Sequence, residues 1–216
     1  MFTSLRYVFL ASLISVPALA GDCPQSCISS CFTLPVCTAD STGESASVHG
    51  ASSFDIPSAH LAAQSSCFEN CCADVTVNED FTLEGLPLGT PIAITARLDV
   101  RIEMNQGYVG GGGAGARLTN PLGGEVQWSV QSPDTGEVDL VRDTVLTLPL
   151  SVQAGSPFRL GFGVNCGSSE MIVSVDGVFS FDGLPSQSSI VSCRGFTQIP
   201  VPTRTTTWGG VKARYR

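Results

Sequence analysis

Residues 92–104 read IAITARLDVRIEM, and every even-numbered position in this stretch is apolar. The odd-numbered positions are polar from Thr95 to Glu103, and Ala93 is neutral. Because successive side chains of a strand point to opposite faces of a sheet, this alternation predicts a long β-strand with one buried and one wet face. Such one-sided burial is typical of antiparallel sheets.

The same alternation recurs before and after this strand, which predicts several more strands. Their apolar positions are Val75, Val77, Phe81 and Leu83; Val126, Trp128 and Val130; Leu146, Leu148, Leu150 and Val152; Phe158, Leu160, Phe162, Val164 and Cys166; and Met171, Val173, Val175, Phe179 and Phe181. Shorter strands are expected at residues 45–50, 59–66, 114–119 and 189–193, and Gly- and Pro-containing turns at 85–91, 134–136 and 154–157 separate the longer ones. The chain therefore predicts an all-β fold, an antiparallel two-sheet sandwich of the jelly-roll type.

The first twenty residues have the pattern of a secretory signal peptide. One cation, Arg6, precedes an apolar stretch from 7 to 19, and Ala18 and Ala20 occupy the small-residue cleavage positions. We expect cleavage after Ala20 and a secreted or cell-surface protein. No later apolar run approaches the ~20 residues of a membrane-spanning helix, so none is expected in the mature chain. The net charge of −8 excludes nucleic acid as a partner, because phosphate contacts need clustered cations.

The nine cysteines are an odd number and are concentrated near the N-terminus. They are Cys23, Cys27, Cys31, Cys37, Cys67, Cys71, Cys72, Cys166 and Cys193. In an exported protein they are expected to form disulfides, with one thiol left free or paired between chains. Metal binding by the first four is the alternative, although their spacing lacks the C-x2-C pairing of zinc ribbons.

Two expectations concern particular cysteines. The adjacent Cys71 and Cys72 are not expected to bridge each other, because neighbouring side chains of an extended segment point apart. Cys166 and Cys193 are expected to pair, because no other cysteines lie in the C-terminal half. The odd thiol would then belong to the N-terminal group.

Composition divides the chain into four parts. Residues 1–20 are the signal peptide, 21–43 a disulfide-rich N-terminal extension, 44–196 the sandwich, and 197–216 a Pro- and Thr-rich linker with a tail. We expect the last part to be detached from the core, either as a disordered, positively charged tail or as a sorting signal. The candidate sorting residues are Trp208, Lys212, Arg214 and Arg216.

No motif in the chain predicts catalysis or a cofactor. The glycine run at 110–113 lacks the lysine and hydroxyl of a phosphate-binding loop and favours a hairpin loop. The two histidines, His49 and His60, are expected on strand edges or faces, and no G-x-S-x-G elbow accompanies them. We therefore expect no enzyme, and we assign no catalytic, cofactor-binding or metal-binding residue.

Acidic and aromatic residues leave two kinds of binding site open. Asp74, Glu79 and Asp80 form one acidic group, and Asp134, Glu137, Asp139 and Asp143 form another. Solvated acids are the favoured interpretation, and a calcium site is the alternative. Trp128 is expected to point into the core, whereas Tyr108, beside the glycine run, is the candidate ligand contact for carbohydrate.

Three longer runs carry a resemblance to a known group of proteins. They are DFTLEGLPLGTPIAITARLDV at 80–100, TVLTLPLSVQAGSPFRLGFGV at 144–164 and VFSFDGLPSQSSIVSCRGF at 178–196. Over residues 44–196 the chain resembles uncharacterised exported bacterial β-sandwich proteins that often carry PEP-CTERM-like or other C-terminal sorting tails. The shared motifs are turn and core motifs, so the resemblance implies the fold and no catalytic residues.

These observations favour a non-catalytic secreted or cell-surface β-sandwich with a structural or adhesive role. A carbohydrate- or calcium-binding extracellular module is the alternative. The expected partners are extracellular polysaccharide or other components of the cell surface, and no cofactor is expected.

Overall fold

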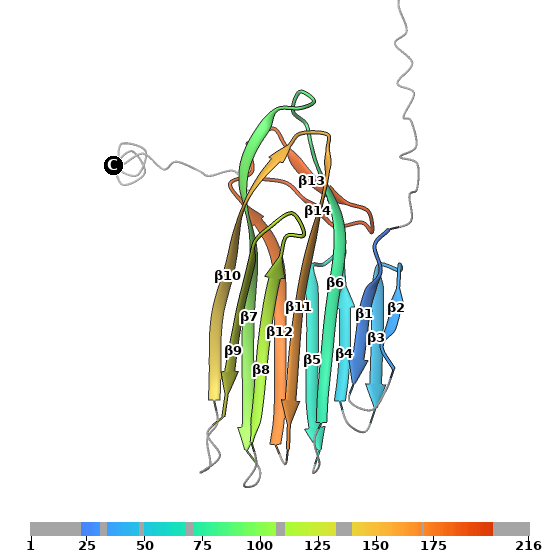
Figure 1. The fold of residues 1–216 in the computed structure, drawn as a ribbon, viewed down its shortest axis with the longest axis vertical. Coiled ribbons are helices and arrows are strands. Elements are labelled where there is room, and N and C mark those ends of the chain that lie inside the picture. The colour runs from blue at the N-terminus through green and yellow to red at the C-terminus, as the bar shows by residue number, and fades with distance from the viewer. Residues whose placement is uncertain are drawn as a thin grey trace, which may run out of the picture.

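The structure, a computed structural model, describes residues 23–30, 34–47, 50–67, 71–106, 111–132, 140–169 and 171–200. These residues form two antiparallel sheets that pack face to face, with their strands along the long axis of the molecule (Figure 1). The described ranges contain no helix, and hence none of a length and apolarity to cross a membrane. The predicted antiparallel two-sheet sandwich is confirmed.

The two sheets are named A and B. Sheet A has the order β14 (Thr197–Gln198), β13 (Ser189–Ser192), β6 (Cys71–Glu84), β11 (Pro157–Ser168), β8 (Gly112–Thr119) and β9 (Glu125–Gln131), and β1 (Ser26–Ser30) joins it by pairing with β6 and with β2 (Val36–Thr38). Sheet B has the order β10 (Leu140–Gln153), β7 (Pro91–Gln106), β12 (Met171–Asp182), β5 (His60–Cys67), β4 (Gly50–Asp55) and β3 (Thr42–Ser47). Consecutive strands from β5 to β12 alternate between the two sheets, except that β8 and β9 are neighbours in sheet A.

The long alternating strand predicted from residues 92–104 is β7, which lies between β10 and β12 in sheet B. Its even-numbered side chains from Ile94 to Met104 are buried between the sheets. Its odd-numbered arginines and acids face outward, with 52% of the Arg101 side chain exposed. The predicted orientation of this strand is therefore confirmed.

Replacing Leu98 with Ala is expected to lower the free energy of unfolding by about 3 kcal/mol, because the fully buried side chain would leave a cavity. Arg101→Ala should leave the free energy of unfolding close to that of the wild type, since this arginine makes only exposed ion pairs. Urea unfolding of both variants measures the difference. Equal losses of stability would contradict the orientation of β7.

Phenylalanines from both sheets form the centre of the core. Phe81, Phe158, Phe162, Phe179, Phe181 and Phe196 pack with ring centroids between 4.3 and 6.2 Å apart. Phe162 of β11 stacks on Phe179 of β12 at 4.3 Å, so the closest ring contact joins the two sheets. Offset and edge-to-face contacts of this kind add to the free energy gained from burial.

The predicted Cys166–Cys193 disulfide is wrong. Cys193 is bonded to Cys23, Cys27 is bonded to Cys37, and Cys166 is a buried free thiol. Along β6, Cys166 lies opposite Ala73, whereas the Cys193 amide donates to the Asp80 carbonyl. Seven residues of strand separate these positions by ~24 Å, far beyond the ~7 Å that a disulfide can bridge.

Two adjacent cysteines of β6 bear on the position of the unpaired thiol. Cys71 and Cys72 are both disulfide-bonded. Among the described side chains the free thiol is Cys166, which was expected to be bonded; Cys31 and the side chain of Cys67, two members of the N-terminal group, lie outside the described residues.

Burial raises the pKa of the Cys166 thiol to about 11, because the thiolate would be desolvated between the sheets. We expect iodoacetamide to leave Cys166 unmodified in the native protein and to modify it in concentrated guanidinium chloride. Because the folded state holds this proton more tightly than the unfolded state, its contribution to stability should be lost as the pH rises from 9.0 to about 11. Peptide mass mapping checks the labelling, and rapid native labelling would contradict the burial of this thiol.

The expectation that Glu79 is a solvated acid is also wrong. Glu79 occupies an inward position of β6, in line with Val77 and Phe81, and is fully buried. Its carboxylate accepts hydrogen bonds from Arg194 Nε at 2.5 Å and from the Arg194 backbone amide at 2.9 Å. The Arg194 guanidinium also donates to Ser26 Oγ, the Asn78 carbonyl and the Asp40 carbonyl. We call this network the Arg194 clamp, and it ties β6 to segments from both ends of the described chain.

Other segments differ from expectation at their boundaries. Residues 112 and 113 of the glycine run belong to β8 rather than to a hairpin loop. The strand expected at 45–50 instead comprises the end of β3 and the start of β4. Thr197 and Gln198, expected in a detached linker, form β14, and the Gln198 side chain bonds the backbone of Phe181. The N-terminal extension contributes β1, which extends sheet A.

Candidate functional site

The outer face of sheet A contains a furrow because β11 presents almost no side chains there. The inward positions of β11 from Phe158 to Val164 are large and apolar, whereas Gly161, Gly163 and Gly167 occupy outward positions beside Asn165. The neighbouring strand β8 adds Gly113 and Gly115, which pair with Gly167 and Asn165. We call this strip, with the side chains of β6 and β9 on either side, the β11 furrow.

An arginine crosses the middle of the furrow. The register places Arg117 of β8 and Thr76 of β6 on opposite sides of Gly163. Arg117 Nη2 donates to Thr76 Oγ1 at 2.6 Å, and the Thr76 hydroxyl donates to Asp74 Oδ1 at 3.1 Å. A Cβ on Gly163 would meet the Val75 carbonyl oxygen, so this close approach of strands requires a glycine. We call this contact the Arg117 bridge.

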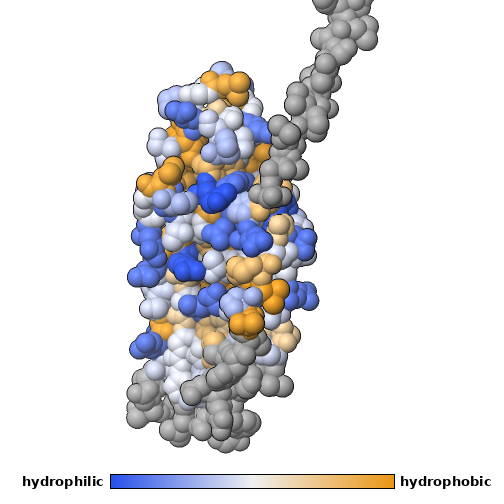
Figure 2. All heavy atoms as spheres, turned by 45° about the vertical axis from the view of Figure 1, so that its right-hand side comes forward, coloured by the Kyte–Doolittle hydropathy of each residue, from blue (hydrophilic) through white to orange (hydrophobic). Residues whose placement is uncertain are grey.

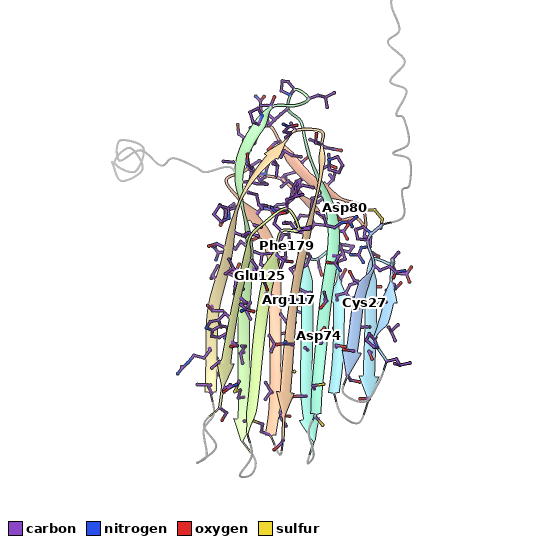
Figure 3. The ribbon with its side chains drawn as sticks, in the orientation of Figure 1. Cys27, Asp74, Asp80, Arg117, Glu125 and Phe179 are labelled. Carbon is purple, nitrogen blue, oxygen red and sulfur yellow. A yellow bond between two sulfur atoms is a disulfide. The ribbon has the colours of Figure 1, made fainter. Side chains whose placement is uncertain are left out.

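Two hollows lie along the furrow on either side of the Arg117 bridge. The first hollow, of about 410 Å³, is lined mainly by polar side chains over a glycine floor, including Asp74, Arg117, Glu125, Gln127 and Asn165. The second hollow, of about 420 Å³, is lined by groups that include Gln25, Asn78, Thr119, Arg159 and Gly161. Figure 3 shows Asp74, Arg117 and Asp80 following one another along the long axis of the sandwich.

The first hollow combines hydrogen-bond donors with acceptors. Only Nη2 of Arg117 has a hydrogen-bond partner among the described residues, and no described carboxylate lies within 4.0 Å of its guanidinium. Asp74 and Glu125 offer carboxylate oxygens, and the amides of Gln127 and Asn165 offer both donors and acceptors. Such a site suits a ligand whose own groups both donate and accept, as hydroxyl groups do.

The second hollow is bordered by an exposed, bidentate ion pair. Arg159 Nε and Nη2 donate to the two oxygens of Asp80 at 2.7 and 2.8 Å. This hydrogen bonding and the charge of Asp80 raise the pKa of Arg159 above its ordinary value. On the floor, the Thr119 hydroxyl donates to the Gly161 carbonyl at 3.1 Å.

A hollow of similar size, about 400 Å³, lies on the outer face of sheet B. Its floor is formed by small side chains such as Ala46, Ala51 and Ser53, and its charged groups are the carboxylates of Glu44 and Asp176. No cation lines it among the described residues, so it offers fewer kinds of contact than the first hollow. In the view of Figure 2, hydrophilic and hydrophobic residues are interspersed and no single apolar patch dominates.

The residues singled out from the sequence do not converge on one site. His60 lies on the outer face of sheet B, 3.5 Å from Asp176, as expected of a histidine on a strand face. Asp143 lies 3.5 Å from Arg101, and Trp128 packs against the core as predicted. The following lie outside the described residues: His49, Tyr108, Asp134, Glu137, Asp139, Trp208, Lys212, Arg214 and Arg216.

The described ranges contain no group of three or more His, Cys, Asp or Glu side chains placed to hold a metal ion. Sequence reasoning missed Arg117, Gln127 and Asn165, which line the first hollow. The signal that could have revealed them is the alternation of large apolar residues with glycine in β11, because it leaves the outward face of a central strand bare.

Comparison with known proteins gives no family. No protein-family model matches the chain, and no curated protein matches it. A structure of TmCBM61 in complex with beta-1,4-galactotriose is 13% identical, with a TM-score of 0.31, over 56% of this chain and 69% of that chain. The enzymatically active domain of Bacteriophage CBA120 tailspike protein 4 is 12% identical, with a TM-score of 0.27, over 72% of this chain and 19% of that chain. These TM-scores are too low for either likeness to bear on the site.

Proposed function

We propose that this protein is an exported, non-catalytic adhesive module that binds a neutral extracellular polysaccharide in the β11 furrow. The observation that carries the proposal is the first hollow, where free donors of Arg117 lie beside carboxylate and amide oxygens over a glycine floor. Sugar hydroxyl groups donate and accept hydrogen bonds, so they match this mixture better than a purely cationic or purely apolar ligand would.

The charges of the furrow favour a neutral chain over an acidic one. Asp74 and Glu125 line the same hollow as Arg117, and the protein carries a net charge of −8. The two carboxylates and the net negative charge would both repel a polyuronate or a sulfated chain, because like charges brought together lower affinity. Each exposed hydrogen bond contributes only about 1 kcal/mol net, so we expect weak single-site binding that becomes adhesive through repeated contacts.

Export is part of the proposal. Disulfides such as Cys23–Cys193 form and persist in oxidising compartments outside the cytosol. The signal-peptide pattern of residues 1–20, with cleavage after Ala20, would deliver the chain to such a compartment.

We further propose that the sandwich is a jelly roll. The orders β5-β12-β7-β10 in sheet B and β6-β11-β8-β9 in sheet A agree with an eight-stranded double-sheet roll, in which one hairpin stays within a sheet. Lectin domains are among the proteins built this way, although the fold alone does not determine function.

Affinity electrophoresis in gels containing a neutral β-glucan, galactan, mannan or xylan tests the proposed function. We expect at least one of these polysaccharides to retard the wild-type protein, and Arg117→Ala to abolish most of that retardation because its free donors are lost. Arg101→Ala, an exposed arginine on the opposite sheet, is the matched control and should be retarded like the wild type. No retardation by any of the four, or equal retardation of all three proteins, would contradict the proposal.

A further inference from the structure

We infer that the polysaccharide lies lengthwise along β11 and fills both hollows at once, passing over the Arg117 bridge. This inference rests on the proposed function and adds to it the direction of the chain and the number of subsites. It also predicts that the ligand is an extended polymer rather than a single sugar or a terminal residue.

The floor of the furrow sets this direction. Gly163 and Asn165 lie at the first hollow, and Arg159 and Gly161 lie at the second, so the same strand forms the floor of both. Arg159 and Asn165 are separated by six steps along the strand, which correspond to ~20 Å at the rise of a strand. In Figure 3, the labelled Asp80 and Asp74 mark the two ends of this course, with Arg117 between them.

The side walls favour a lengthwise course over a path across the sheet. β6 carries Asp74 and Asn78 along one side of the furrow, and β9 carries Glu125 and Gln127 along the first hollow on the other side. A Cβ on Gly161 would come within 2.5 Å of Thr119 Oγ1 and 3.2 Å of Asn78 Oδ1, so glycine keeps the floor low between these neighbours. A chain running along β11 can contact both walls, whereas a chain crossing the sheet would have to pass over them.

The arginines of the two hollows differ in how many of their nitrogen donors are already hydrogen-bonded. This difference predicts the order in which the ligand fills the two hollows. Arg117 keeps free donors in the first hollow, whereas two nitrogens of Arg159 are already engaged by Asp80. A short sugar should therefore occupy the first hollow. A longer chain then reaches the second hollow as an intramolecular step, which raises affinity without any change in the first contact.

A ladder of oligosaccharides, prepared from the polysaccharide that retards the wild-type protein most, tests this inference by calorimetric titration. We expect the hexasaccharide to bind at least about tenfold more tightly than the disaccharide. Arg159→Ala should reduce this ratio to below about threefold and leave disaccharide binding unchanged, since it removes a contact of the second hollow alone. Arg101→Ala, which removes an equally exposed ion-paired arginine from sheet B, should retain the wild-type ratio.

The outcomes separate the inference from the proposed function. Equal affinity for the disaccharide and hexasaccharide, or a length dependence that Arg159→Ala leaves intact, would overturn the lengthwise course. The proposed function would still stand in both cases if Arg117→Ala weakens binding. Absence of binding at every length would overturn both.

Discussion

Replacing Arg194 with Met is expected to lower the free energy of unfolding by about 3–5 kcal/mol. The exposed fractions of the Arg194 and Glu79 side chains are 2% and 0%, so the substitution would leave an uncompensated carboxylate in the core. It would also remove the guanidinium hydrogen bonds to Ser26 and to two backbone carbonyls. Urea unfolding followed by circular dichroism measures the change.

Two further variants make this test specific. Arg159→Met breaks an exposed pair and should change stability little, because exposed ion pairs contribute little. The double variant Glu79→Met/Arg194→Met removes both buried charges and should recover part of the loss. A single Arg194→Met variant as stable as the wild type would contradict the clamp.

The Cys23→Ser/Cys193→Ser double variant is expected to lose about 5 kcal/mol. This disulfide joins residues 170 positions apart, and the entropy of the unfolded chain that it removes grows with loop length. The Cys27→Ser/Cys37→Ser double variant opens a loop of only 10 positions and should lose about 3 kcal/mol. Thermal or urea unfolding under non-reducing conditions compares the two.

The two large effects should not be additive. Cys193 precedes Arg194 directly, so the disulfide and the clamp hold the same turn against β6. Removing either should loosen the other, and the combined loss of stability should differ from the sum of the separate losses.

For the two disulfide variants, a larger loss of stability from opening the short loop than from opening the long one would contradict the assigned pairing.

Alternation along the chain was sufficient to predict the long strands. The pattern around Leu98 determined which face of β7 is buried, because a shift of one residue would place every apolar side chain in water. By the same alternation, position 79 lies on the buried face of β6, although the charge of Glu79 suggested a solvated acid. Its partner Arg194 is 115 residues away, and no local sequence pattern predicts a contact between residues so far apart.

Neither the disulfide pairing nor the candidate site could be predicted from the sequence, for related reasons. Pairing depends on which strand ends meet, and Cys166 and Cys193 lie at different heights along β6. The furrow depends on which strands are neighbours in sheet A, since Arg117 reaches Thr76 only because Gly163 lies between them. Glycines in β8 suggested a loop, whereas in the sheet they form part of the floor.

Residue-resolved NMR can locate the binding of a neutral polysaccharide to the β11 furrow. The ¹⁵N-labelled protein would be titrated with oligosaccharides of the polysaccharide that retards it. We expect chemical-shift changes confined to amides around the furrow, including those of Gly163, Arg117 and Asn165, with the outer face of β7 and β12 in sheet B unaffected. Shifts centred on that face of sheet B, or no shifts at saturating oligosaccharide, would contradict binding in the furrow.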